Sequence, residues 1–179
     1  MPSIGHLAVG LAAARVTRRR DGPSPWAWSL LLIVLSFLPD ADVIAFRLGI
    51  PYGAAYGHRG AFHSLAFAAM VGFALWPLAR AMRGPAIFVA LSGAAVMATH
   101  GLLDALTDGG KGIALLWPFT DERFFAPWRP IPAAPIGPRI LSAAGLKLMA
   151  WEAMLFLPFF IVGLWPSRSD AAAQRSLAR

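Results

Sequence analysis

The feature that most constrains this fold is a series of apolar segments separated by basic or Pro/Gly-rich connections. Hydrophobic residues make up 58% of the 179-residue chain, and charged residues make up 14%. Soluble domains average roughly 45–50% apolar and about 25% charged residues. A soluble fold of this length cannot easily bury so large an apolar excess, so the composition predicts that the chain resides in a membrane.

Five apolar segments predict an all-α, integral-membrane helical bundle. They cover residues 4–16, 26–38, 62–81, 85–106 and 140–165. The last three are long enough to cross a bilayer, which takes about 20 residues. The first two are shorter, and we expect them either to cross a locally thinned region or to lie partly re-entrant against the other helices.

The connection at residues 107–139 is unusually rich in proline and glycine. This composition predicts an ordered loop outside the bundle rather than a helix. We therefore expect a single membrane-embedded domain over residues 1–165, followed by a polar cytoplasmic tail over residues 166–179.

Arginine clusters follow the first, third and fifth segments, and they predict the topology. The clusters are Arg15, Arg18, Arg19 and Arg20, then Arg80 and Arg83, then Arg168, Arg175 and Arg179. Cytoplasmic connections of membrane proteins carry an excess of Lys and Arg. The N-terminus, residues 40–61 and residues 107–139 are therefore predicted to face outward, away from the cytoplasm.

The formal net charge of +7 does not by itself indicate nucleic-acid binding. The arginines lie between apolar segments and are not interleaved with aromatic residues on a polar stretch, so we expect no nucleic-acid partner. Their placement is typical of topology signals and of contact with anionic membrane lipids. The chain contains no cysteine, so any metal ion must be held by histidine and carboxylate side chains.

All four histidines and several aspartates fall on the predicted outer side. The candidate metal ligands are His6, Asp40, Asp42, His58, His63, His100 and Asp104. His100 and Asp104 are four residues apart, so they share one face of a helix and can bind one ion. The same spacing also allows a simple hydrogen-bonded pair, although ionisable groups inside membrane segments are usually functional.

The other candidate ligands lie in turns. Asp40 and Asp42 follow Pro39, where the second segment is expected to end, so both carboxylates can converge there or merely cap the turn. His58 and His63 lie on either side of a glycine that leads into the third segment. The predicted site therefore brings together three separate parts of the chain.

Imidazole and carboxylate ligands suit Zn²⁺ first, with Mn²⁺ or Fe²⁺ as alternatives. The candidates outnumber the three protein ligands of a typical catalytic zinc and suffice for one or two ions. Two ions sharing a carboxylate suit phosphoester hydrolysis. We name Asp40, Arg59 and Asp108 as candidate catalytic residues, with Arg59 placed to bind a phosphate or carboxylate of the substrate.

These motifs resemble the YdjM-like, LexA-regulated family of membrane-bound metal-dependent hydrolases. The resemblance rests on His6, LPDAD at residues 38–42, HRGAFHS at residues 58–64 and HGLLDALT at residues 100–107. They follow in order over roughly residues 1–120. The resemblance implies an integral-membrane hydrolase that uses these histidines and aspartates as metal ligands, and it supplies no substrate. It also implies a bacterial inner membrane, which we expect the chain to cross several times with the metal site on the periplasmic side.

The favoured hypothesis is a hydrolase in which metal-activated water cleaves a phosphoester of a lipid-like or small periplasmic substrate. A metal-ion transporter, a membrane protein with a purely structural metal and a soluble helical enzyme are the alternatives. Glu152, in the middle of the fifth segment, is the residue that suits a transporter. It can be a ligand, a partner of a buried cation or part of a proton path.

Overall fold

A computed structural model describes residues 3–81, 83–135 and 137–165. The predicted cytoplasmic tail and its arginines lie outside the described residues. Within these ranges the regular elements are helical, and the only extended pairings are isolated bridges between Thr107 and Ile131 and between Ile113 and Phe124. The prediction of an all-α bundle is confirmed.

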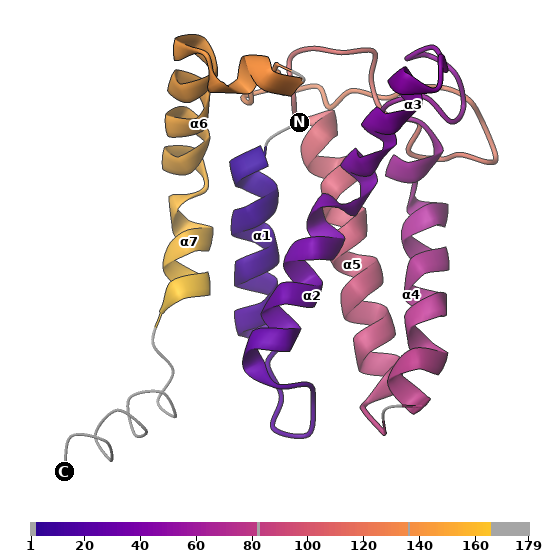
Figure 1. Ribbon diagram of the computed structural model, residues 1–179, viewed down its shortest axis with the longest axis vertical. Helices are drawn as coiled ribbons and strands as arrows, with labels where there is room; N and C mark the ends of the chain where they lie inside the picture. The colour runs from indigo at the N-terminus through magenta and orange to yellow at the C-terminus, as the bar shows by residue number, and fades with distance from the viewer. Residues whose placement is uncertain (1–2, 82, 136, 166–179) are drawn as a thin grey trace.

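Four helices lie side by side along the long axis of the molecule (Figure 1). They are α1 (Ser3–Val16), α2 (Pro25–Phe37), α4 (Leu65–Ala81) and α5 (Ala86–Ala105). The chain reverses direction from each of these helices to the next, so the N-terminus of α1, residues 38–64 and the loop after α5 share one end of the bundle. This pairing of connections agrees with the one predicted from the arginines.

The helical structure of the second apolar segment does not end before Pro39 as predicted. The chain tightens into a 3-10 helix, η1 (Leu38–Val43), and continues into α3 (Ile44–Arg47). Pro39 occupies the first turn of η1, where its missing N–H leaves no helical hydrogen bond unmade. Residues 25–47 together form an apolar helical stretch of 23 residues, which is long enough to cross a membrane.

The other long segments also differ in detail from the prediction. A short 3-10 helix, η2 (Ala61–His63), precedes α4, which has 17 residues, whereas α5 has 20 and is long enough to span. The fifth segment follows η3 (Gly137–Leu141) and is broken at Phe156 into α6 (Ala143–Leu155) and α7 (Leu157–Leu164), which differ in direction by 65°. Pro158 lies in the first turn of α7, a position where proline leaves no hydrogen bond of that helix unmade.

Small residues allow the helices of the bundle to pack closely. A Cβ atom on Gly72 of α4 would lie 2.7 Å from both Ala90 O and Ala94 Cβ of α5. Similarly, a Cβ atom on Gly10 of α1 would lie 2.9 Å from the Ser36 hydroxyl of α2. Close approach over small residues is a common way for helices to associate in membranes, where lipid removes the usual hydrophobic driving force.

The Pro/Gly-rich loop after α5 covers one end of the bundle, and Arg123 holds it there. The Arg123 guanidinium donates hydrogen bonds of 3.1–3.4 Å to backbone carbonyls of both the loop and residues 52–59. The acceptors are Tyr52, Ala54, His58, Arg59 and Gly112. These contacts order the two loops that surround the predicted site.

Candidate metal centre

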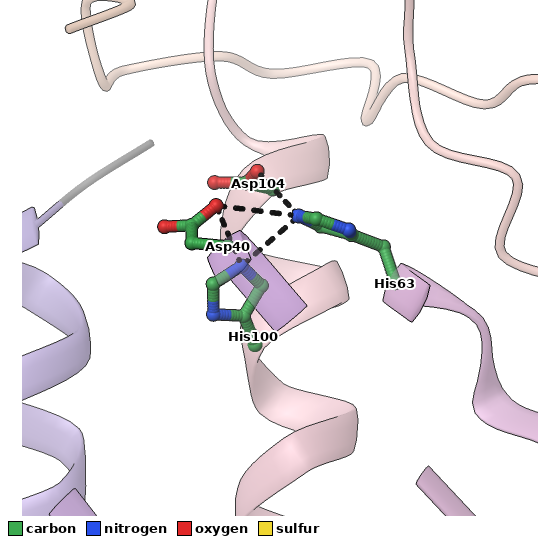
Figure 2. A group of neighbouring side chains, drawn as sticks. All are labelled: Asp40, His63, His100 and Asp104. Atoms are coloured by element: carbon green, nitrogen blue, oxygen red, sulfur yellow. Dashed lines mark hydrogen bonds and ion pairs between the residues drawn. The ribbon is translucent and has the colours of Figure 1, made fainter. Parts of the chain in front are cut away.

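Four of the predicted ligands converge at this end of the bundle (Figure 2). Asp40 comes from η1, His63 from the end of η2, and His100 and Asp104 from the last two turns of α5. One nitrogen or oxygen of each lies within 4.8 Å of those of the other three, and all four residues are buried. The sequence spacing of His100 and Asp104 does place both on the same face of α5.

The separations between these atoms suit one coordination sphere. His63 Nε2 lies 3.1 Å from His100 Nε2 and 3.5 Å from both Asp40 Oδ1 and Asp104 Oδ2. His100 Nε2 lies 3.4 Å from Asp40 Oδ1. Bonds of about 2.0–2.2 Å in a tetrahedral zinc site put neighbouring ligand atoms about 3.3–3.6 Å apart. The four side chains therefore fit a single ion of this size.

The orientation of His100 also suits a metal ligand. Its Nδ1–H donates a 2.7 Å hydrogen bond to the backbone carbonyl of Ser36, which leaves the lone pair of Nε2 directed at the cluster. A backbone carbonyl behind a metal-bound imidazole commonly selects the tautomer in this way. Nε2 of His100 and Nε2 of His63 face each other at 3.1 Å, a separation that requires a proton or a cation between two lone pairs.

Two further buried atoms fit a cation bound in this region. Asp40 Oδ1 and His6 Nε2 are buried and, among the described residues, have no hydrogen-bond partner. Burial of a polar atom without a partner is costly, and such atoms in native proteins call for an explanation such as an ion. A cation bound among the four side chains would satisfy Asp40 Oδ1.

The electrostatic surroundings of His63 favour positive charge at this position. Burial alone would lower the pKa of His63, but the carboxylates of Asp104, Asp40 and Asp42 outweigh it and raise the pKa to about 10. A divalent cation would take the place of that proton. The cluster therefore has the charge balance of a cation site.

Asp42 contacts His63 on the Nδ1 side of its ring, away from the four-residue group. Its Oδ1 accepts a 2.6 Å hydrogen bond from His58 Nδ1, and its Oδ2 accepts one of 3.1 Å from the backbone N–H of Arg59. The same Oδ2 lies 3.1 Å from His63 Nδ1, an ion-pair contact without the alignment of a hydrogen bond. Asp42, His58 and His63 form a second group of possible ligands, which shares His63 with the first. A second ion in that group stays a prediction.

His6 lies beside the four-residue group. Its ring stacks on that of His100, with centroids 3.7 Å apart and planes 8° apart, and its Nε2 is 3.6 Å from Asp104 Oδ1. The structure therefore brings together all seven predicted ligands in one buried region. Within it, the two predicted to share a helix face lie in the same four-residue group.

The two remaining candidate catalytic residues lie in different surroundings. Arg59 is buried, with its Nε 3.1 Å from Asp104 Oδ2 and its guanidinium donating a 2.8 Å hydrogen bond to Gly109 O. Asp108 is exposed, and its carboxylate accepts a 2.7 Å hydrogen bond from the Ala133 N–H. Arg59 thus borders the cluster, whereas Asp108 lies outside both groups and secures the loop.

Sequence reasoning missed the Ser36 carbonyl and Arg123. Ser36 acts through its backbone, so no residue type could have marked it. Arg123 lies in the loop after α5, and its sequence position does not distinguish it from the other arginines of that loop. Glu152 was recognised as unusual, but its partner, the Ile4 N–H of α1, could not be derived from spacing.

The comparison with known families rests on nearly the whole chain. The model of a family described as "YdjM inner membrane protein" matches residues 1–171. The chain belongs to this family. The resemblance found in the motifs is thereby confirmed, and every candidate ligand lies within the part that the YdjM model describes.

A YdjM-family relative from a bacterium supports residence in a membrane. The inner membrane protein YbcI of Escherichia coli (strain K12) is 47% identical over 129 residues, which cover 70% of this chain and 75% of that protein. No solved structure matches the chain. Together with the apolar helices, the family and this relative support the predicted localisation in an inner membrane.

Proposed function

We propose that this YdjM-family protein is a membrane-embedded, metal-dependent hydrolase. The observation that carries the proposal is the convergence of Asp40, His63, His100 and Asp104 at the separations of one coordination sphere. A bound divalent ion, Zn²⁺ first and Mn²⁺ or Fe²⁺ as alternatives, would supply Lewis acidity and activate water near neutral pH.

Asp40 is the proposed general base. Its side chain is 10% exposed, whereas those of His63, His100 and Asp104 are at 0%. The accessible side of the group is therefore beside Asp40. In the hydrolase, His63, His100 and Asp104 would hold the ion and Asp40 would border the fourth position, which a catalytic zinc site keeps for water. At that side the Asp40 carboxylate would accept a proton from the attacking water.

A lipid-like phosphoester is the proposed substrate class. An apolar cavity of about 360 Å³ adjoins the site, with Asp42 in its lining and Leu38, Ile44, Phe62 and Phe67 among the other residues. Such a cavity suits the apolar part of a substrate whose polar group is cleaved nearby. Arg59 would stabilise negative charge at the site, and its direct contact with a substrate phosphate stays part of the proposal.

A structural metal site is the second candidate function. Structural zinc sites are closed, with four protein ligands, and four side chains converge here. The two functions differ in the role of Asp40. As a base, Asp40 is needed for turnover, whereas in a structural site its loss affects only metal retention and stability.

The test is elemental analysis of the detergent-purified protein beside turnover of a soluble phosphodiester and of phospholipid in mixed micelles. The wild-type protein is expected to contain bound metal and to release product. His100→Ala and Asp104→Ala should lose both, while Asp40→Asn should lose turnover and keep most of the metal. Turnover by folded His100→Ala and Asp104→Ala would show that hydrolysis does not depend on this metal centre and would overturn the proposal. A metal-loaded wild type that cleaves neither substrate would favour the structural site.

We also infer that the helices cross the membrane several times and that the metal centre faces the periplasm. The connection between α1 and α2, which contains Arg18 to Arg20, lies at the opposite end of the bundle from α3 and the end of α5 (Figure 1). Because the chain has no cysteine, single cysteines at Asp108 and at Asp21 report the two ends without background. A membrane-impermeant thiol reagent added to spheroplasts should label position 108 only, and labelling of position 21 instead would reverse the orientation.

A further inference from the structure

Glu152 is a buried carboxylate that the proposed chemistry does not use. It lies on α6, is 1% exposed, and its Oε2 accepts a 2.9 Å hydrogen bond from the backbone N–H of Ile4. Ile4 is in the first turn of α1, where backbone N–H groups have no partner within their own helix. In apolar surroundings no water is at hand, so the partner must come from the protein. Glu152 therefore caps α1 from a neighbouring helix.

A second contact fixes the same turn of α1. Phe156, one turn after Glu152, lies in the break between α6 and α7 and is buried. It packs so closely on Gly5 that a Cβ atom there would lie 2.6 Å from its ring. The start of α1 is thus held in register with the α6–α7 break by one hydrogen bond and one apolar contact.

This register determines where His6 lies. His6 follows Ile4 by two residues, and its ring depends on the height of α1 to stack on His100 and to face Asp104. A slide of α1 by a single residue would move His6 by about 1.5 Å along the axis. That displacement is enough to lose the stacking contact of 3.7 Å.

We propose that Glu152 is a positioning residue of the metal centre, which acts by holding the first turn of α1 so that His6 packs against His100 and Asp104. Its consequence for metal binding rests on the proposed function, whereas its effect on the position of His6 does not. The carboxylate is required as a hydrogen-bond acceptor, so a glutamine, which keeps an acceptor oxygen, should replace it.

The test compares Glu152→Ala with Glu152→Gln in detergent-solubilised full-length protein, with Leu32→Ala as a control. Leu32 is fully buried in the helix packing away from Glu152, so its truncation should lower the melting temperature without moving α1 at the cluster. We expect Glu152→Ala to weaken Zn²⁺ binding about 10–100-fold, the loss typical of residues that support metal ligands. Glu152→Gln and Leu32→Ala should bind Zn²⁺ with close to wild-type affinity.

A second measurement does not depend on metal. In the metal-free protein, stacking on His100 should shift the ring-proton NMR signals of His6 upfield, and this shift should persist in Glu152→Gln and disappear in Glu152→Ala. Loss of the shift in both variants would assign Glu152 a role that needs its charge, and retention in both would exclude positioning. A wild type that binds none of Zn²⁺, Mn²⁺ and Fe²⁺ would refute the proposed function, while the NMR result would still decide the role of Glu152.

Discussion

At one end of the bundle a group of charged side chains is buried together, whereas at the other end the charged side chains lie in the open. Asp42 and Asp104 have no exposed side-chain surface and are surrounded by histidines and Arg59. Arg19 and Asp21 form an ion pair of 2.8 Å with side chains 48% and 62% exposed. Both ends are rich in charge, yet only the first is organised around a common point.

The difference follows from the cost of burial. A buried charge is unfavourable unless it is paired and hydrogen-bonded, so a cluster of buried carboxylates and imidazoles needs a compensating arrangement. An exposed arginine is solvated by water and lipid headgroups and needs none. Substitutions at the cluster end should therefore have large and specific effects on metal binding, and those at the arginine end should not.

Among substitutions outside the four-residue group itself, the largest effect is expected for Asp42→Asn. The uncharged amide accepts hydrogen bonds from His58 and from the Arg59 N–H more weakly than the carboxylate does. The hydrogen-bonded group that holds His63 in place is therefore weakened. Metal affinity should fall about 10–100-fold. Competition with a fluorescent Zn²⁺ chelator measures it. Asp21→Asn is the matched control, and an equal loss of affinity in both variants would contradict the contrast between the two ends.

Gly101→Ala should have the next largest effect. A Cβ atom at Gly101 would lie 2.4 Å from the carbonyl oxygen of His63, so α5 and η2 would have to separate and His63 would move away from His100. Overpacking of this kind typically costs about 1–3 kcal/mol. The expected result is a lower melting temperature together with weaker metal binding, measured by thermal denaturation with and without Zn²⁺.

Gly22→Ala is the control for this substitution at the arginine end. A Cβ atom there would meet Arg19 Cβ at 3.5 Å, an ordinary van der Waals distance. Its melting temperature should match that of wild type. If Gly101→Ala behaved in the same way as Gly22→Ala, the close packing of η2 on α5 would not be needed to form the cluster.

The contrast also shows what could be predicted from sequence. The apolar segments predicted the helices, and the arginines predicted which polar residues share an end, because both signals act through composition over many residues. The continuation of the helix past Pro39 was missed, because the effect of a proline depends on which position of a helical turn it occupies. The breaks at His63 and Phe156 shifted helix ends for similar local reasons.

The partners of individual side chains were the least predictable part. The pairing of Arg59 with Asp104 joins residues 45 positions apart, and Glu152 reaches Ile4 across 148 positions. Neither follows from spacing, because each depends on how helices pack. The residue types that can bind a metal were visible in the sequence, whereas the atoms that orient them came only from the structure.

The smallest effect is expected for Arg19→Ala. This substitution removes an ion pair whose atoms are as close together as those of the ion pairs in the metal cluster. Arg19 donates two hydrogen bonds of 2.8 and 2.9 Å to Asp21, but both side chains are exposed. Exposed ion pairs gain little, because water solvates the separated charges almost as well and salt screens them. Arg19→Ala should leave metal affinity unchanged and the melting temperature almost so, in both low and high salt. A clear loss of metal affinity in this variant would mean that the arginine end of the bundle influences the metal centre. The difference in burial would then not explain the different effects of substitutions at the two ends.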